Sequence, residues 1–286
     1  MRGQAQLPGL HTFRITDAGI QVFPRAIIEA SPGSQPAPGE RLAMGVPRLD
    51  EMLGGGVPSG YSLLVAGPAG SGKTILATAF LAEGARQGET GVIAAFEKSP
   101  RQARSRALEE LLRTGQVAVI DTRALDLSID ETLYELTEAI RRKNAKRVVI
   151  DSLSGFELAL AAAFREDFRE SLYRMVAVLT GMGATVLMTT ELEDRYTDLR
   201  FSPYGAAFLT DAIIVERYIE VQSRLKRVIA VVKVRGSAHS NELREFEITN
   251  EGIFIGDALS QYQGLFSGRT ALAKLTEPSA RSDSIR

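Results

Sequence analysis

The octapeptide GPAGSGKT at positions 67–74 decides how the rest of the chain is interpreted. It matches the whole pattern G-x4-G-K-[ST], in which glycines let backbone N–H groups point inward around an anion. An apolar run at 62–66 precedes it, and the helix-forming run ILATAFLAEGARQ (75–87) follows it. Strand, glycine-rich loop and helix in this order predict a binding site for a nucleoside triphosphate.

Each residue type in this loop has a physical role. The positive end of the following helix points at the phosphates. The Lys73 ammonium reaches the β- and γ-phosphates, where it also acts as a catalytic charge, and the Thr74 hydroxyl is a ligand for Mg²⁺. The predicted nucleotide-binding residues of the loop are Gly67, Gly70, Ser71, Gly72, Lys73, Thr74 and Ile75.

Two acidic residues at the ends of apolar strands complete the predicted site. The run RVVID (147–151) ends in Asp151, which we expect to be the second protein ligand of Mg²⁺. The run GVIAAFEKSP (91–100) carries Glu97 just after its strand, where a carboxylate can orient or deprotonate the attacking group. Ligands bind at the carboxyl ends of parallel strands, so both acids lie on the correct side of the sheet.

The composition excludes several classes of protein. The net charge is −1 over 286 residues, so no global basic excess favours nucleic acid or an anionic membrane as a partner. Cysteine is absent, which rules out disulfides and thiolate metal sites. The N-terminal stretch lacks the apolar core of a signal peptide, and no apolar run approaches the length of a membrane span. We expect a cytoplasmic protein.

Hydrophobic periodicity predicts an α/β fold. Short apolar runs alternate with helical patterns, which indicates a mostly parallel central sheet flanked by helices. The predicted strands are 62–66, 91–96, 117–121, 147–151 and 184–190. Ser99 and Ser128 are predicted helix N-caps, the second with Glu131 in a capping box, and another helix runs through Phe168 and Leu172. After position 210, three strand-like runs predict a C-terminal β-meander.

An internal repeat bears on domain organisation. Residues 1–23 align without gaps with residues 234–256, and Phe13, Ile15, Thr16, Gly19 and Ile20 recur as Phe246, Ile248, Thr249, Gly252 and Ile253. Two interpretations stay open: two similar hairpins in one domain, or a first hairpin that is the tail of a preceding copy of the same domain, which we favour. The predicted divisions are a tail-like hairpin at 1–23, a proline-rich linker at 24–40, an ATPase domain at 41–258 and a flexible tail at 259–286.

Four motifs together resemble the KaiC family of RecA-type ATPases, which includes the cyanobacterial clock protein. They are GVPRLDEMLGGGVPSGYSLLVAGPAGSGKT (45–74), AFEKSP (95–100), RVVIDSLSGFE (147–157) and VVKVRGSAHSNELREFEIT (231–249). The resemblance covers about residues 41–256. It implies a RecA-like fold, ATP and Mg²⁺ as cofactors, and a hexameric ring with ATP between subunits. Members of the family often carry two such domains in tandem.

The resemblance also assigns residues that the spacing alone does not. Lys233 and Arg235 match positions that reach the triphosphate of the neighbouring subunit, like an arginine finger, and Ser237 and His239 match further contacts in that segment. Glu97 matches the first of two adjacent catalytic glutamates, whereas the second is replaced here by Lys98.

Self-phosphorylation of the clock type is not supported. The acceptor Ser and Thr positions of the clock protein are Ala207 and Phe208 in this chain, although Ser202 and Thr210 lie nearby. Autokinase activity at shifted positions therefore stays open.

The resemblance favours an ATP-hydrolysing ring that signals to or remodels protein partners. A DNA-acting recombinase or helicase-like motor on the same fold is one alternative, but the segment ELEDRYTDLRFSPYGAA (191–207) holds more acids than bases. A nucleotide-bound scaffold with negligible turnover is the other alternative, because Lys98 replaces a catalytic acid.

Overall fold

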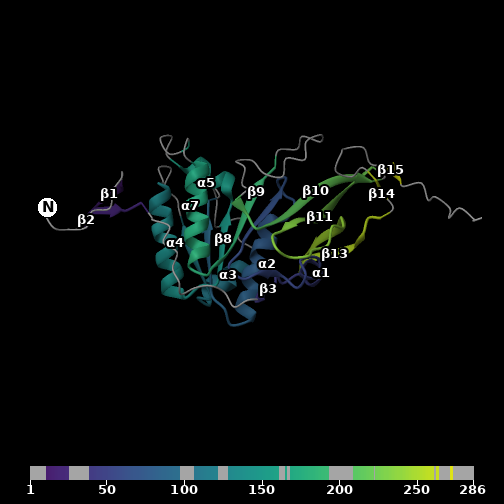
Figure 1. The fold of residues 1–286 in the computed structure, drawn as a ribbon, viewed down its shortest axis with the longest axis horizontal. Coiled ribbons are helices and arrows are strands. Elements are labelled where there is room, and N and C mark those ends of the chain that lie inside the picture. Colours follow the sequence, from purple (N-terminus) through teal and green to yellow (C-terminus); the bar gives the residue numbers. More distant parts are fainter. Residues whose placement is uncertain are drawn as a thin grey trace, which may run out of the picture.

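A nine-stranded sheet forms the centre of the molecule in the computed structural model (Figure 1). The structure describes residues 11–25, 39–96, 106–121, 128–160, 165, 168–192, 209–221, 223–260, 262–263 and 271–272. The strand order is β13-β12-β11-β10-β5-β9-β8-β6-β7. The five strands from β5 to β7 in this order are parallel, and the other four form the meander. The predicted fold class is confirmed.

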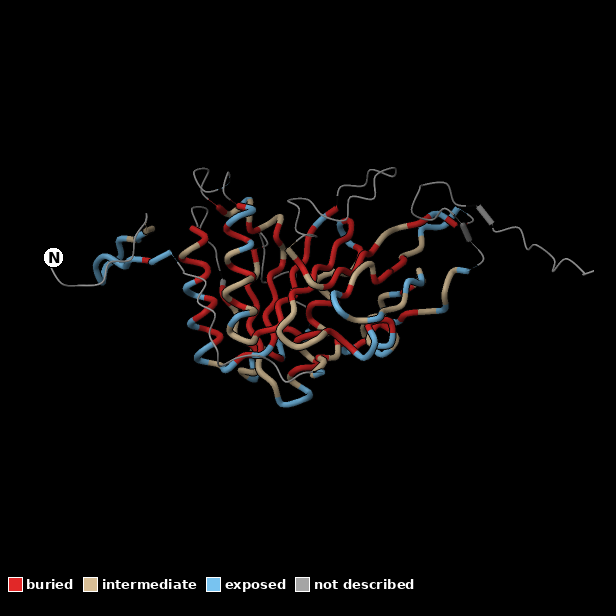
Figure 2. Tube along the Cα trace, viewed as in Figure 1, coloured by how far each residue is buried: buried red, intermediate tan, exposed pale blue. Residues whose placement is uncertain are grey.

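The parallel strands are the apolar runs of the sequence, shifted by one residue at most. They are β5 (Ser62–Gly67), β6 (Gly91–Ala95), β7 (Val117–Asp121), β8 (Arg147–Asp151) and β9 (Thr185–Glu191). Strands buried on both faces need continuous apolar residues, which is why these runs do not alternate with polar ones. Figure 2 shows them as the buried interior of the molecule.

The predicted meander joins the parallel sheet through its first strand. The meander strands are β10 (Ala212–Val221), β11 (Arg224–Val234), β12 (Arg244–Thr249) and β13 (Gly252–Ala258). Strand β10 pairs parallel with β5, with Ala212 opposite Leu63 and Val215 opposite Ala66, and antiparallel with β11. Residues that begin β10 therefore lie beside the start of β5, and later residues lie beside its end.

Helices cover both faces of the sheet. Helices α1 (Pro47–Met52), α2 (Lys73–Arg86) and α3 (Arg106–Arg113) share one apolar core with Leu63 and Val65 of β5. Helices α4 (Ile129–Lys143), α5 (Leu153–Ala159) and α7 (Phe168–Gly181) share the other core with Leu64 and Ala66. The alternation along β5 follows from the two-residue period of a strand. None of the described helices is both long and apolar enough to cross a membrane.

The predicted cap of α4 is half correct. The Ser128 hydroxyl accepts a hydrogen bond of 3.1 Å from the Glu131 backbone N–H, as an N-cap serine should. The Glu131 carboxylate, which a capping box would turn back towards Ser128, instead binds the Arg14 guanidinium at 2.6 and 2.7 Å. A charged partner from another segment outcompetes the local amide. The predicted helix start at Ser99 lies outside the described residues.

Four short strands form two further pairs outside the central sheet. Strands β3 (Arg41–Leu42) and β4 (Val57–Pro58) pair with each other, as do β14 (Tyr262–Gln263) and β15 (Ala271–Leu272). The β3–β4 pair flanks α1, and its side chains Leu42 and Val57 join the core that α1 and α2 share.

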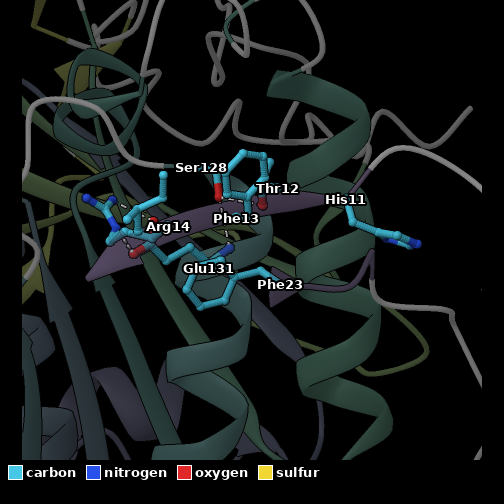
Figure 3. A pocket seen from close by; sticks show the side chains of 8 residues that line it. His11, Thr12, Phe13, Arg14, Phe23, Ser128 and Glu131 are labelled. Carbon is cyan, nitrogen blue, oxygen red and sulfur yellow. Dashed lines mark hydrogen bonds and ion pairs between the residues drawn. The ribbon is translucent and has the colours of Figure 1, made fainter. Parts of the chain in front are cut away.

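The repeated segment forms a separate hairpin beside α4 (Figure 1). Strands β1 (Thr12–Thr16) and β2 (Gly19–Phe23) pair with Phe13 opposite Val22 and Thr16 opposite Gly19. The β12–β13 hairpin has the same register at the equivalent positions, and both threonines donate to the carbonyl of their glycine, at 3.1 and 3.2 Å. Figure 3 shows the first hairpin against α4, with Arg14 reaching Glu131 and Thr12 beside Ser128.

Candidate nucleotide-binding site

The loop at 67–74 connects the end of β5 to the start of α2. Gly70 and Gly72 have positive φ angles of 74° and 132°, which side chains rarely allow. In glycine-rich loops of this kind, such angles let backbone N–H groups turn towards an anion at the start of the following helix. Backbone N–H groups at a helix start favour an anion, which is the basis of the phosphate site predicted here.

Close packing explains two of the loop glycines. A Cβ atom at Gly67 would lie 2.9 Å from the Glu216 Cβ and 2.9 Å from the Ser71 hydroxyl. A Cβ atom at Gly72 would lie 3.0 Å from the Ile248 side chain of β12. Strands β10 and β12 of the meander therefore pack directly against the loop. Glycine is needed at these two positions because no side chain would fit between the loop and the meander.

The Lys73 side chain lies within the loop. Its ammonium donates hydrogen bonds to the Gly67 carbonyl at 2.8 Å and the Pro68 carbonyl at 2.7 Å. The following residue, Thr74, is the second residue of α2, and its hydroxyl is directed to Asp151 at the end of β8. Ile75 beside it is half-buried. The Lys73 ammonium therefore lies inside the loop, where the sequence predicts the phosphates to bind.

Thr74 and Asp151 meet as the sequence predicts. The Thr74 hydroxyl donates to one Asp151 carboxylate oxygen at 2.8 Å, and the Thr189 hydroxyl of β9 donates to the other. Hydroxyl and carboxylate oxygens beside a phosphate site are the ligands that Mg²⁺ prefers, so the residues present fit this ion. The sequence analysis missed Thr189, although a polar residue at the end of a buried strand is a signal for such a contact.

The predicted catalytic acid Glu97 lies outside the described residues. Its strand β6 ends beside Asp151, because Ala95 pairs with Asp151 and the Phe96 N–H donates to the Asp151 carbonyl at 2.9 Å. Phe96, the last described residue before Glu97, therefore lies at the carboxyl ends of the parallel strands, where the loop also begins.

The structure separates Lys233 and Arg235 from the phosphate loop of the same chain. The Lys233 ammonium donates to the Thr210 carbonyl at 2.6 Å, and the Arg235 guanidinium donates to Asp211 at 3.0 Å. Asp211 also accepts from the backbone and side chain of Ser62, the first residue of β5. Both cations thus lie at the start of β5, whereas the loop follows its end.

Ser237 and His239 follow Arg235 in the chain and lie with Lys233 and Arg235 near the start of β5. Ser237 accepts a hydrogen bond from the Arg41 guanidinium, and the His239 Nδ1 is 3.5 Å from the Ser237 carbonyl. The site residues predicted from the sequence and described in the structure therefore form two clusters, one at each end of β5.

Thr210 is not an accessible phosphate acceptor in this structure. Its exposed fraction is 0%, and its hydroxyl has no hydrogen-bond partner among the described residues. Ser202, Ala207 and Phe208 lie outside the described part of the chain.

Comparison with known proteins identifies the family. The model of the family described as "ATPase: KaiC" matches residues 42–260. The circadian clock oscillator protein KaiC of Rippkaea orientalis is 30% identical over the whole of this chain, which covers 55% of that protein. The protein of the same name from Acaryochloris marina is 29% identical over 97% of this chain and 53% of its own length. The chain therefore spans about half the length of these curated relatives.

A solved structure agrees in fold. A KaiC-like protein of the hyperthermophilic archaeon Pyrococcus horikoshii OT3 superposes with a TM-score of 0.68 and 32% identity. The match covers 77% of this chain and all of that chain. With a family match over most of its residues and a phosphate loop completed by Thr74 and Asp151, the chain belongs to the KaiC family of ATPases.

Proposed function

We propose that this chain binds Mg-ATP at the 67–74 loop and hydrolyses it. The observation that carries the proposal is the loop itself, in which Lys73 lies among the carbonyls and Thr74 contacts Asp151. Lys73 would hold the β- and γ-phosphates and stabilise the charge of the transition state. Thr74 and Asp151 would hold the metal, whose charge polarises the phosphoryl group, and Glu97 would orient the attacking water.

The test is the nucleotide affinity of a Lys73→Ala variant. Removing the ammonium takes away the one cation of the loop, so we expect binding of ATP to be lost or greatly weakened and turnover to disappear. Isothermal titration calorimetry measures the affinity, with Lys143→Ala as the control, since Lys143 contacts the Gly115 carbonyl away from the loop. Equal affinity of the Lys73 variant and the wild type would overturn the proposal.

We infer that the active site is shared between subunits of a ring. Arg235 and Lys233 lie beside Ser62, five residues before Gly67 along an extended strand, so about 16 Å separates them from their own loop. The Arg235 side chain is 60% exposed, which leaves its guanidinium open to a neighbouring molecule. A hexamer with ATP at each interface brings these cations, with Ser237 and His239, to the next subunit's phosphates.

Protein partners, rather than DNA, fit the rest of the proposal. The net charge of −1 offers no excess of cations for a phosphate backbone. ATP turnover in the ring would then signal to or remodel other proteins. Autokinase activity of the clock type has no acceptor, because Ala207 and Phe208 occupy the acceptor positions and Thr210 is buried.

The first hairpin supports a tandem organisation. Phe13, Ile15, Ile20 and Val22 form one exposed apolar face, whereas their counterparts Phe246, Ile248, Ile253 and Ile255 are packed in the core around α2. We propose that the exposed face packs on a preceding ATPase domain in the same way. The division at 41–258 then encloses one complete ATPase domain.

A further inference from the structure

Glu216 forms part of the floor of the phosphate loop. It follows the residues of β10 that pair with β5, so it lies beside Gly67. A Cβ atom added at Gly67 would touch both the Glu216 backbone carbonyl and its Cβ at 2.9 Å. The sequence places a charged residue directly after four buried apolar ones, but only the pairing of β10 with β5 puts it under the loop.

The Glu216 carboxyl group is enclosed. Its exposed fraction is 0%, and neither carboxyl oxygen has a hydrogen-bond partner among the described residues. The Ser71 hydroxyl lies next to it and is likewise without a partner in the described part of the chain. An ionised carboxylate is costly in such a place, so the protonation state of Glu216 depends on the Ser71 hydroxyl and on the charges around it.

Charged and titratable groups approach this site from three directions. Lys73 at the start of α2 and Arg227 of β11 act on Glu216 by their positive charges. Tyr218, two residues along β10, is on the same side of the strand, with its hydroxyl 3.4 Å from the position of a Gly70 Cβ. The residue of β5 that lies beside Glu216 is Gly67, so this strand adds no charge next to the carboxyl group. The Lys73 ammonium donates to the carbonyls of Gly67 and Pro68, so it lies within the loop where the triphosphate would bind.

We propose that Glu216 is a proton-binding site coupled to the phosphate loop, which takes up a proton when a nucleoside triphosphate binds. The inference rests on the proposed nucleotide binding at the loop. The triphosphate adds negative charge next to the carboxyl group, and it draws the Lys73 ammonium onto the phosphates. Both changes disfavour the ionised form of Glu216, so the proton enters from solvent and neutralises it.

In the protein without nucleotide, the pKa of Glu216 is already close to neutral pH, so the coupling acts in that range. Burial raises the pKa of Glu216 to about 7, against the opposing influence of the Ser71 hydroxyl and the Lys73 and Arg227 charges. Below that pH the group is already neutral in the free protein. Above it, binding must drive the proton uptake, and linkage requires that affinity for the nucleotide falls as the pH rises.

Calorimetry in buffers with different ionisation enthalpies counts the protons. At pH 7.5, with saturating Mg²⁺ and a non-hydrolysable ATP analogue, we expect the wild type to take up roughly half a proton more than Glu216→Gln. Glutamine has the shape of the protonated acid and cannot titrate. Subtracting the proton uptake of this variant from that of the wild type therefore removes the protons that the nucleotide itself exchanges. Glu220→Gln, exposed on the same strand, is the matched control and should behave as the wild type.

The outcomes separate the two proposals. Tight binding with equal proton uptake in the wild type and Glu216→Gln would overturn the role of Glu216 while leaving nucleotide binding intact. No binding by the wild type would overturn the proposed function and this inference with it. The wild type alone gives a second measurement: between pH 6.5 and 8.5 its affinity should fall by about three- to tenfold, and a flat profile would contradict the coupling.

Discussion

Gly67 lies between Glu216 and Ser71, at a distance that excludes any side chain. This close contact determines both the residue that fits at position 67 and the environment of the Glu216 carboxyl group. The loop can curve around a phosphate because Gly67 and Gly72 allow the meander to approach closely. The close approach also buries the Glu216 carboxyl group, whose oxygens have no hydrogen-bond partner among the described residues, so its ionised form is unfavourable next to the site.

Replacing this charge should stabilise the protein at high pH. The pKa of Glu216 is about 7 in the folded protein, above its ordinary value of 4.5. The stability that protonation provides is therefore complete below pH 4.5 and is lost as the pH rises to 7 and beyond. At pH 8 the difference corresponds to about 3 kcal/mol. Glu216→Gln should raise the free energy of unfolding by about 2–3 kcal/mol at pH 8 and by much less at pH 5.

Urea unfolding at both pH values measures this effect. Glu220→Gln, whose side chain is exposed on the same strand, controls for the removal of one negative charge. A gain for Glu216→Gln that is equal at pH 5 and pH 8 would show that its charge is not the cause.

At the scale of elements, two hairpins with the same register lie in different environments. Phe13 of the first hairpin is 62% exposed, whereas Phe246 of the second is 2% exposed and packs near Gly72. The first hairpin is attached to α4 through its other face, by the Arg14–Glu131 ion pair and the contact of Phe23 with Tyr134. The same local sequence thus forms the same hairpin, and the neighbouring surface decides which side chains are buried.

Paired truncations measure this difference. Phe246→Ala should lower the free energy of unfolding by about 3–4 kcal/mol, because it removes a buried ring and leaves a cavity under the phosphate loop. Phe13→Ala should change it by less than about 0.5 kcal/mol, since the ring already contacts water. Denaturant unfolding of both variants under one set of conditions is sufficient. Equal losses would mean that the first hairpin is packed as tightly as the second and has no free face.

The elements themselves were predictable from the sequence, because each depends on local patterns. The apolar runs gave the parallel strands within a residue, and Ser128 capped α4 as expected. What local patterns do not contain is the order of strands. Glu216 and Thr189 were missed because their importance arises when β10 and β9 flank β5. The predicted capping contact of the Glu131 side chain was wrong for the same reason, since its actual partner, Arg14, comes from a distant segment.

At the scale of the whole molecule, the functional residues divide between the two ends of β5. The phosphate loop and Asp151 lie at one end, and Lys233, Arg235, Ser237 and Asp211 lie at the other. A single subunit cannot bring the two groups together without unfolding its sheet. A ring of subunits would join them by placing the second group of one molecule against the first group of the next, which is the central claim of the proposed function.

Complementation between two inactive variants tests this claim most directly. Arg235→Ala should lose about 10³-fold in turnover or more while its subunits still bind ATP. Its fold should persist, because the lost ion pair with Asp211 is exposed and contributes little. Lys73→Ala fails in its own loop but still offers Arg235 to a neighbour.

The two variants are co-expressed, mixed rings are verified by native mass measurement, and ATP hydrolysis is assayed. We predict that mixed rings recover part of the activity, because some interfaces pair an intact loop with an intact arginine. Mixed rings that form and show no activity above either parent would contradict the shared active site.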